Sequence, residues 1–247
     1  PLWPATRLTA LFEAVHDLDR VAADVAHRLG IDALPAYRLE TLEDRDWERE
    51  WLRDFGPMRF GARLWVCPRG VQAPDADAVI VELDPGLAFG TGTHPTTALC
   101  LAWLDSLPLE GKTVIDYGAG SGILAIAALK LGARRALAYD IPQAVIATRE
   151  NAEANGVADR LEVTLRKDDL EHPADVVIAN ILAGPLIELA TEILDLTITG
   201  GTLALSGILS EQVPEVSRAY ASGLRLDPPA YQDQDGQTWA RLTGIRL

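Results

Sequence analysis

The stretch TVIDYGAGSG (residues 113–122) decides the fold that this sequence predicts. Its first half is apolar and rich in β-branched residues, which is typical of a buried strand. Its second half carries glycine at positions 118, 120 and 122, and glycine lets the backbone turn tightly and pass close to a ligand. The apolar residues that follow predict a helix over residues 122–131, so a strand, a glycine-rich turn and a helix come in direct succession.

From Lys112 to the end of the chain, strand patterns alternate with helix patterns. The predicted strands cover residues 113–117, 135–140, 161–165, 175–180, 201–206 and 238–246, and the predicted helices cover residues 122–131, 144–155, 185–194 and 211–222. Such alternation indicates an α/β fold whose sheet is covered by helices on both faces. We therefore expect a doubly wound, mostly parallel, seven-stranded Rossmann-like sheet, with its ligand at the carboxyl ends of the strands.

The part of the chain before this sheet predicts smaller units. Residues 7–13 and 37–42 have strand patterns, and residues 46–52 predict a charged amphipathic helix. Residues 18–29 predict a helix with Asp17 as N-cap and Gly30 as C-cap. These elements are too few for a core of their own. We therefore expect a partial N-terminal α+β domain over residues 1–56, connecting strands within residues 57–83, and the main domain over residues 84–247.

Composition limits the classes of function. The 247 residues include 22 Lys+Arg and 36 Asp+Glu, and the formal charge of −14 disfavours a surface that binds nucleic-acid phosphates. The charge suits a basic partner, although solubility alone explains it equally well. We expect no membrane span, because no apolar run is long enough, and no metal site, because the four histidines are scattered. Two cysteines fit a reducing cytoplasm.

The end of the second strand indicates a cofactor that contains a nucleoside. Asp140 follows Gly118 by 22 residues, and an acid at this place accepts the hydroxyls of a ribose. Gly118 and Gly120 would then lie against the same ligand. A dinucleotide motif needs a small residue where this chain has Ile123, whereas the Asp-x-Gly-x-Gly-x-Gly spacing resembles the first motif of S-adenosylmethionine-dependent methyltransferases. A purely structural turn is the alternative.

Two further strand ends carry polar candidates. Asn180 ends the fourth strand, and its amide can orient a cofactor or substrate through a donor and an acceptor, although it could also serve only a turn. Methyltransferases that act on amide nitrogens typically carry a motif resembling Asn-Pro-Pro-aromatic at this place. Ile181 and Leu182 therefore disfavour methylation of an amide. Asp168 or Asp169, after the third strand, could meet an adenine amino group, and a solvated loop acid is equally consistent.

Three stretches closely resemble one family: LDPGLAFGTGTHPTT (residues 83–97), SGILAIAA (residues 121–128) and ANILAGP (residues 179–185). They are similar to the PrmA family, bacterial methyltransferases of the eleventh protein of the large ribosomal subunit. The resemblance extends from about Leu42 to the C-terminus. It implies S-adenosylmethionine contacts at Thr97, Gly118, Asp140 and Asn180, and it places Phe89 and His94 in a loop over the cleft.

The resemblance also implies the reaction. We expect a cytoplasmic protein methyltransferase that acts on lysine or α-amino nitrogens of that ribosomal protein, with residues 1–56 recognising the substrate and residues 84–247 binding the cofactor. The alternatives are methyl transfer to a small molecule or nucleic acid, a non-catalytic nucleotide-binding module, and a dehydrogenase. No residue stands out as a catalytic base, so the catalytic residues stay unassigned.

The sequence departs from the family pattern at two places. Asp140-Ile141-Pro142 is one acid short of the family's Asp-hydrophobic-Asp-Pro, so we expect the ribose contact of Asp140 to survive and an auxiliary contact to be lost. The opening strand-helix-strand portion of the family's N-terminal domain is not found before Arg7. We therefore expect these 247 residues to bind the cofactor normally and to methylate the ribosomal protein weakly or not at all.

Overall fold

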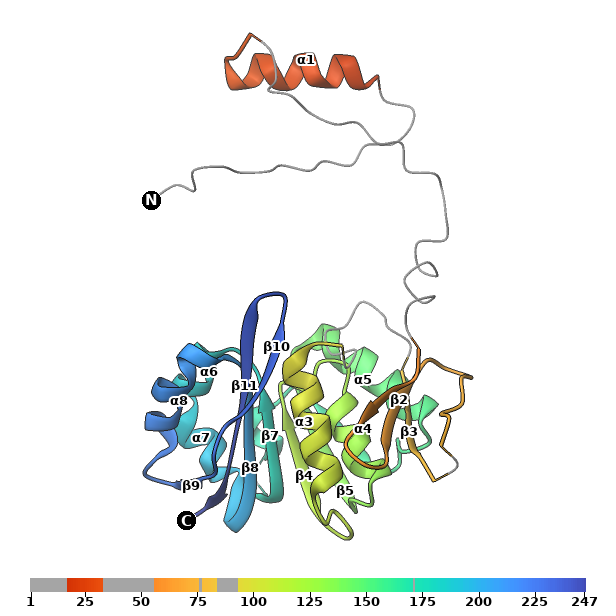
Figure 1. The fold of residues 1–247 in the computed structure, drawn as a ribbon, viewed down its shortest axis with the longest axis vertical. Coiled ribbons are helices and arrows are strands. Elements are labelled where there is room, and N and C mark those ends of the chain that lie inside the picture. Colours follow the sequence, from red (N-terminus) through yellow and green to blue (C-terminus); the bar gives the residue numbers. More distant parts are fainter. Residues whose placement is uncertain (1–16, 33–55, 76, 84–92, 171) are drawn as a thin grey trace. The chain divides into compact units, whose positions relative to one another are not determined.

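A computed structural model describes residues 17–32, 56–75, 77–83, 93–170 and 172–247 (Figure 1). The chain divides into two compact units, Pro1–Glu50 and Trp51–Leu247. The expected strands at residues 7–13 and 37–42 and the expected helix at residues 46–52 lie outside the described residues. The three-part division at residues 56 and 83 stays a prediction.

In the first unit, helix α1 (Leu18–Leu29) begins and ends where its capping residues predict. The Asp17 carboxylate accepts hydrogen bonds from the backbone N–H groups of Asp19 at 3.1 Å and Arg20 at 3.3 Å. Gly30 adopts the left-handed conformation with φ of 67°, which is costly for residues with a Cβ. Both predicted caps are confirmed.

The second unit contains the main sheet, which is eight-stranded within the described residues. In spatial order its strands are β10 (Ala230–Gln234), β11 (Gln237–Arg246), β8 (Thr197–Leu209), β7 (Ala174–Asn180), β4 (Thr113–Tyr117), β5 (Arg135–Tyr139) and β6 (Leu161–Thr164), with β9 (Leu224–Leu226) also beside β11. The five strands from β8 to β6 run parallel, and β11 is antiparallel to β8. The predicted α/β, doubly wound, mostly parallel sheet is confirmed.

One position at the edge of this sheet is shared by β9 and β10, so the eight strands occupy seven places. Both strands pair with β11, β9 near its end and β10 near its start. Pro228 and Pro229 separate them, and proline has no N–H to donate to a strand pair. These two strands are not predicted from the sequence, because the prolines interrupt their pattern.

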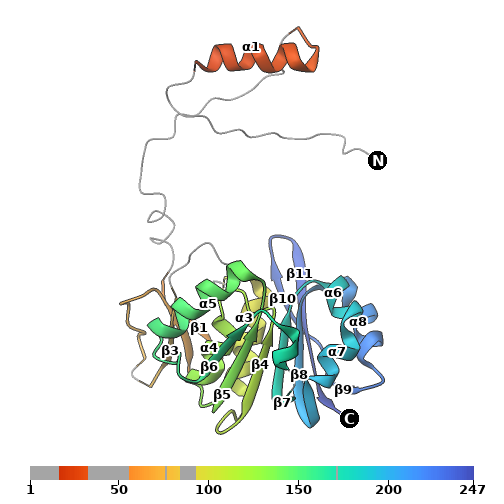
Figure 2. The same cartoon turned by 180° about the vertical axis from the view of Figure 1, so that it is seen from behind.

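Helices cover both faces of the sheet (Figures 1 and 2). One core contains residues of α3 (Pro95–Ser106), α4 (Ile123–Lys130) and α5 (Pro142–Ala154), and the other contains residues of α6 (Ala183–Glu188), α7 (Ala190–Asp195) and α8 (Val213–Tyr220). Two predicted helices differ in detail. Residues 185–194 form two helices because Leu189, with φ of −99° and ψ of 13°, interrupts them, and residues 211–222 begin as the short 3₁₀ helix Ser210–Gln212 before α8.

None of the helices in the described ranges is both long and apolar enough to cross a bilayer.

A small three-stranded sheet is bound to the helices of the main domain by hydrogen bonds. It contains β1 (Met58–Phe60), β2 (Leu64–Cys67) and β3 (Val79–Glu82). Asp105 of α3 accepts hydrogen bonds from the N–H groups of Ala62 at 2.5 Å and Arg63 at 3.1 Å. Asn155, directly after α5, binds Glu82 as a neighbouring strand would: its Oδ1 accepts from the Glu82 N–H at 2.8 Å, and its Nδ2 donates to the Glu82 carbonyl at 2.7 Å. The connecting strands expected within residues 57–83 are confirmed as β1, β2 and β3.

Asn155→Ala should reduce the free energy of unfolding by about 1–3 kcal/mol, because it leaves the backbone groups of Glu82 without their partners. Denaturant titration measures the loss, and hydrogen exchange should locate the faster amides in β3. An unchanged exchange rate at Glu82 would show that Asn155 does not hold this strand.

Candidate active site

The register of the parallel strands brings the predicted site residues to one edge of the sheet. Tyr117, the last residue of β4, pairs with Tyr139 on one side and with Ala179 on the other. Asn180, the last residue of β7, pairs with Ser206 of β8. The glycine-rich turn, Asp140 and Asn180 therefore follow or end adjacent strands at the same edge.

The glycine-rich turn after β4 needs glycine for its own packing. Gly118, Gly120 and Gly122 have φ values of 80°, 59° and 77°, in the region where residues with a Cβ are strained. A Cβ on Gly118 would also lie 2.4 Å from Cγ2 of Ile181, and one on Gly122 would lie 2.5 Å from Cγ2 of Thr148. A side chain at Gly118 therefore collides first with Ile181 of the protein itself.

Asp140 is held in place by two backbone donors. Its Oδ2 accepts from the Gly120 N–H at 2.6 Å, and its Oδ1 accepts from the Ile141 N–H at 2.6 Å. Each carboxylate oxygen has a second acceptor site. Asp140 therefore fixes the glycine-rich turn to the end of β5 and still retains acceptor capacity for hydroxyl groups.

The missing acid after Asp140 has a structural consequence at the start of α5. Ile141 occupies the N-cap position, no side chain among the described residues caps it, and Pro142 is the first helical residue. An aspartate before that proline would be a preferred N-cap. With this departure from the family pattern, α5 has no side-chain cap from the part of the chain that the structure describes.

Thr97 and Asn180, 83 residues apart in sequence, are in contact. The Asn180 Nδ2 donates to the Thr97 Oγ1 at 3.3 Å. Thr97 lies in the first turn of α3, where backbone N–H groups and the helix dipole favour an anion. The structure thus brings two of the predicted cofactor residues together at the edge where β7 ends.

His94 begins α3 as its N-cap. Its Nδ1 accepts from the Thr96 N–H at 3.4 Å and lies 2.8 Å from the Thr96 Oγ1. Burial lowers the pKa of His94, which keeps the imidazole neutral and able to accept. Its ring contacts the ring of Trp239 edge-on, with centroids 4.5 Å apart. The sequence placed His94 in a loop and did not identify this capping role, and Phe89 lies outside the described residues.

The two candidate acids after β6 differ in their surroundings. Asp168 forms a surface ion pair with Arg166 at 3.4 Å, and both side chains are mostly exposed. Asp169 accepts a hydrogen bond from the Thr164 hydroxyl at the end of β6, and the Thr164 carbonyl accepts from the Asp140 N–H at 3.3 Å. Asp169 is therefore the acid that lies with Asp140 at the carboxyl edge.

Asp116, just before the glycine-rich turn, is fully buried. Its Oδ2 accepts from the Ala125 N–H of α4 at 3.1 Å, and its Oδ1 has no hydrogen-bond partner among the described residues. Burial raises the pKa of Asp116 to about 7, the hydrogen bond from Ala125 opposes the rise, and the charge of Asp140 adds to it. In the sequence, Asp116 is noticed only as the first residue of the Asp-x-Gly-x-Gly-x-Gly spacing, and its burial is not predicted.

Three residues that support the site were missed. The Thr148 hydroxyl of α5 donates to the Gly120 carbonyl at 2.9 Å, and Asn151 donates to the Ser121 carbonyl at 2.9 Å. Gly207 of β8 has φ of 87°, and a Cβ there would lie 2.3 Å from the carbonyl oxygen of Ile181. A lone glycine inside a strand pattern signals such a close backbone approach, so Gly207 was detectable from sequence.

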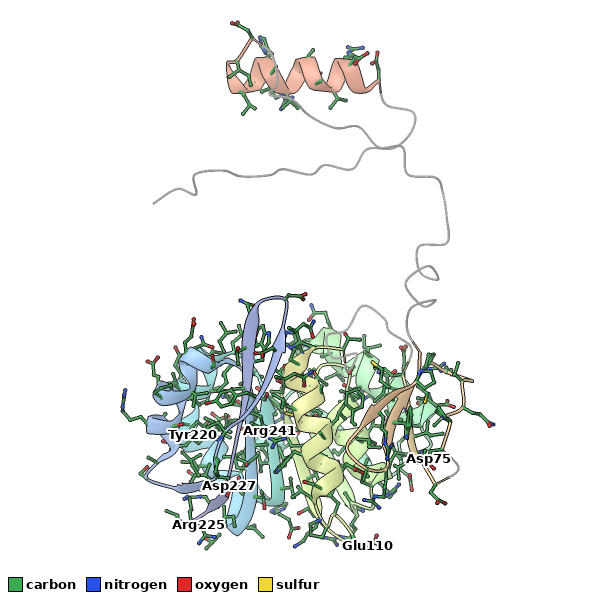
Figure 3. All side chains as sticks on the ribbon, viewed as in Figure 1. Asp75, Glu110, Tyr220, Arg225, Asp227 and Arg241 are labelled. Atoms are coloured by element: carbon green, nitrogen blue, oxygen red, sulfur yellow. The ribbon has the colours of Figure 1, made fainter. Side chains whose placement is uncertain are left out.

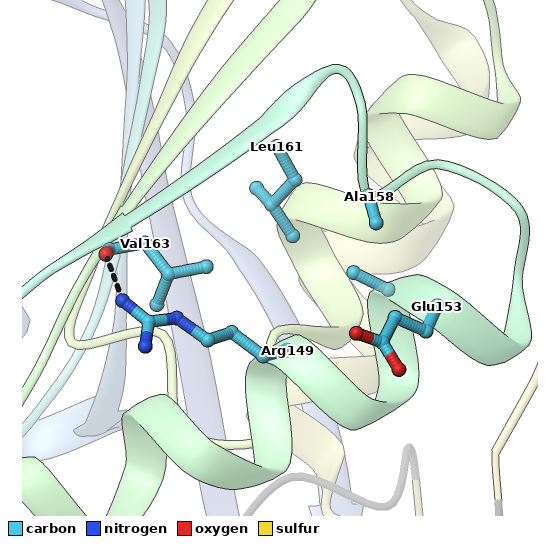
Figure 4. A pocket seen from close by; sticks show the side chains of 6 residues that line it. Arg149, Glu153, Ala158, Leu161 and Val163 are labelled. Atoms are coloured by element: carbon cyan, nitrogen blue, oxygen red, sulfur yellow. Dashed lines mark hydrogen bonds between the residues drawn. The ribbon is translucent and has the colours of Figure 1, made fainter.

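A separate pocket of about 230 Å³ lies between α5 and β6 (Figure 4). Its lining residues are Arg149, Ala152, Glu153, Ala158, Leu161 and Val163. Arg149 reaches across it and donates to the Val163 carbonyl at 3.1 Å. None of the predicted cofactor residues lines this pocket.

Comparison with known proteins decides the family. The family model described as ribosomal protein L11 methyltransferase (PrmA) matches residues 1–246. The chain belongs to the ribosomal protein L11 methyltransferase family. The match starts at residue 1, well before Leu42, where the motifs placed the beginning of the resemblance.

Individual members of the family are close relatives. A ribosomal protein L11 methyltransferase of Escherichia coli is 58% identical over 245 residues, which cover 98% of this chain and 82% of the relative. The corresponding protein of Shigella boydii has the same identity and coverage. The crystal structure of ribosomal protein L11 methylase from Lactobacillus delbrueckii subsp. bulgaricus has a TM-score of 0.70 at 32% identity and covers 78% of this chain and 99% of that one.

A more distant structure agrees in fold alone. The crystal structure of SMU.776, which is complexed with SAH (S-adenosylhomocysteine), has a TM-score of 0.52 at 15% identity and covers 67% of this chain and 53% of that one.

Gly207→Ala should destabilise the protein more than Gly200→Ala, a matched change on the same strand. Both glycines have positive φ, but no atom of the described residues lies within 4 Å of a Cβ on Gly200. We expect Gly207→Ala to cost about 1–3 kcal/mol more in the free energy of unfolding, because it displaces the backbone of Ile181 beside Asn180. Equal losses in denaturant titration would contradict the close approach.

Asp116→Asn should flatten the dependence of stability on pH. In the native protein Asp116 keeps its proton up to about pH 7, whereas the unfolded chain releases it near the ordinary value of 3.8. Stability from this group therefore falls as pH rises from about 4 to 7, by up to about 1.4 kcal/mol per pH unit. Denaturant titrations between pH 5 and 8 should show this fall in the wild type and not in the variant. Parallel profiles of stability against pH for the two proteins would contradict the raised pKa of Asp116.

Proposed function

We propose that this chain transfers methyl groups from S-adenosylmethionine to lysine and α-amino nitrogens of ribosomal protein L11. The observation that carries the proposal is the 58% identity, over 98% of the chain, to a ribosomal protein L11 methyltransferase. The chain is therefore a protein-lysine N-methyltransferase, and small molecules and nucleic acids are disfavoured as substrates.

The residues at the carboxyl edge fit S-adenosylmethionine. Asp140 retains acceptor capacity for the ribose hydroxyls, and its carboxylate is already oriented by two backbone N–H groups. The Oδ1 of the buried Asp116, which has no hydrogen-bond partner among the described residues, suits a cationic amino group. The first turn of α3 at Thr97 suits a carboxylate. We propose Thr97, Gly118, Gly120, Asp140 and Asn180 as the cofactor-binding residues.

The chain's own contribution to catalysis is alignment. When bound, S-adenosylmethionine supplies an electrophilic methyl group on a sulfonium sulfur. A neutral amine forms the new N–C bond while the C–S bond breaks, and the amine nitrogen then releases a proton to water. Asn180 and the glycine-rich turn orient the reactants, which converts an encounter of two molecules into a step within one complex.

The lysine substrate must lose its proton before it reacts, since its ordinary pKa is about 10.4. Transfer of the amine from water into a closed site lowers that pKa. This route needs no dedicated base, and we assign none.

The charge of the chain supports a basic protein substrate. Its formal charge of −14 attracts cationic surfaces and repels nucleic-acid phosphates. We propose that residues 1–56 recognise the substrate and that residues 84–247 form the methyltransferase domain. We also propose the cytoplasm as its location, because ribosomal proteins are made there and Cys67 and Cys100 are free thiols.

Mass spectrometry of free ribosomal protein L11 tests the proposal directly. Incubation with the chain and S-adenosylmethionine should add mass in whole methyl units at lysine side chains or the N-terminus. This replaces the weak or absent methylation expected from the motifs alone, because the family match that begins at residue 1 supports an active chain. Ribosomal RNA and a metabolite extract, incubated in parallel, should stay unmodified. Methylation of the RNA or of a metabolite, and not of the protein, would overturn the proposed substrate.

Asp140→Asn should weaken binding of S-adenosylhomocysteine by about ten- to a hundredfold, because a charged acceptor for the ribose is lost. Asparagine keeps one oxygen for the Gly120 N–H, so the turn is preserved better than in an alanine variant. Calorimetry measures the affinity for S-adenosylhomocysteine. An unchanged affinity in a folded variant would show that Asp140 does not bind the cofactor.

A further inference from the structure

The first turns of α3 are fastened to the sheet by side chains from the C-terminal part of the chain. The Ser206 Oγ lies 3.3 Å from the Thr96 carbonyl and 3.1 Å from the Ala240 carbonyl, and Ser206 is completely buried. Ser206 is also the register partner of Asn180, which contacts Thr97. Neighbouring positions of β7 and β8 thus hold neighbouring residues of α3.

A β-bulge makes this arrangement possible. Ala240 pairs with Ile208 and Leu242 pairs with Leu205, so Arg241 of β11 faces both Ser206 and Gly207 of β8. The positive φ of Gly207 is typical of such a bulge. Bulges are common beside active sites, where they direct a side chain away from the regular pleat.

Arg241, at the bulge, reaches the next turn of α3 (Figure 3). One terminal nitrogen of its guanidinium donates to the Leu99 carbonyl, and the guanidinium lies over the Trp103 ring, 5.9 Å from its centre. Ser206 and Arg241 therefore contact two carbonyls of α3 that are three residues apart and lie on the same side of the helix.

These contacts are directional, unlike the apolar packing around them. Burial of a hydroxyl or a guanidinium is costly unless it forms hydrogen bonds. Apolar side chains at both places would pack α3 against the sheet but would not fix how the helix slides or rotates. Hydrogen bonds to particular helix carbonyls fix both.

We propose that Ser206 and Arg241 are positioning residues for methyl transfer, which fix the first two turns of α3 so that Thr97 meets Asn180. The inference rests on the proposed function of Thr97 as a cofactor residue. Ser206 and Arg241 act through α3, and neither is assigned a contact with the reactants.

The test compares Ser206→Ala and Arg241→Met with Thr197→Val. Thr197 is a matched control, because it is a buried hydroxyl on the same strand, 3.5 Å from the Ile193 carbonyl in α7. In the protein without cofactor, both test variants should raise hydrogen exchange at the amides of residues 97–100 by about three- to tenfold, and the control should not.

Calorimetry with S-adenosylhomocysteine gives the functional readout. Ser206→Ala should weaken binding by about three- to tenfold, and Thr197→Val should leave it unchanged. In a Thr97→Val background, Ser206→Ala should have little further effect, because both changes act through the same contact.

The outcomes separate this inference from the proposed function. Unchanged exchange at residues 97–100 in Ser206→Ala would overturn the positioning role, whether or not the wild type binds the cofactor. Equal effects of Ser206→Ala and Thr197→Val on affinity would also overturn it, as would additivity with Thr97→Val. A wild type that binds no S-adenosylhomocysteine would overturn the proposed function, while the exchange data still decide whether Ser206 and Arg241 hold α3.

Discussion

The parallel pairing of β4 with β5 on one side and β7 on the other is the constraint on which the site depends. Parallel neighbours in register end at the same edge, so Tyr117, Tyr139 and Ala179 lie in one row. The residues that follow each strand must then share the space beyond that row. A shift of one strand would separate Asp140 from the Gly120 N–H, and the acid would lose its orientation.

Unusually close contacts with the backbone hold the carboxyl edge of the sheet in place. The segment after β7 passes between two glycines, with the Ile181 side chain against Gly118 and the Ile181 backbone against Gly207. Asn180 directly precedes this segment, so its amide is fixed by packing that leaves no room for a Cβ on either side. Rigid support of this kind favours a reaction whose rate depends on alignment.

Local signals predicted the elements whose ends depend on a few neighbouring residues. The caps of α1 and the succession of β4, turn and α4 follow from Asp17, Gly30 and the glycines of residues 113–122. The placement of Gly118, Asp140 and Asn180 at one edge followed from fold topology, and Thr97 was assigned there by the family resemblance. The hydrogen bond between Asn180 and Thr97 followed from neither, because it joins residues 83 apart.

The remaining features depend on contacts that no local pattern contains. Asn155 binds Glu82 across 73 residues, and Ser206 lies beside the Thr96 carbonyl across 110. The strands β9 and β10 were not predicted, because prolines separate them in the sequence. They pair only because β11 lies beside them. Each of these cases is decided by tertiary packing, which overrides local propensity.

The central claim is that the carboxyl edge of the sheet holds the cofactor. A crystal structure of the chain with S-adenosylhomocysteine tests it most directly. The account predicts ribose hydroxyls within hydrogen-bond distance of the Asp140 carboxylate and the amino-acid end of the ligand beside Thr97 and Asp116. Density for the ligand in the pocket between α5 and β6, with the edge around Asp140 empty, would contradict it.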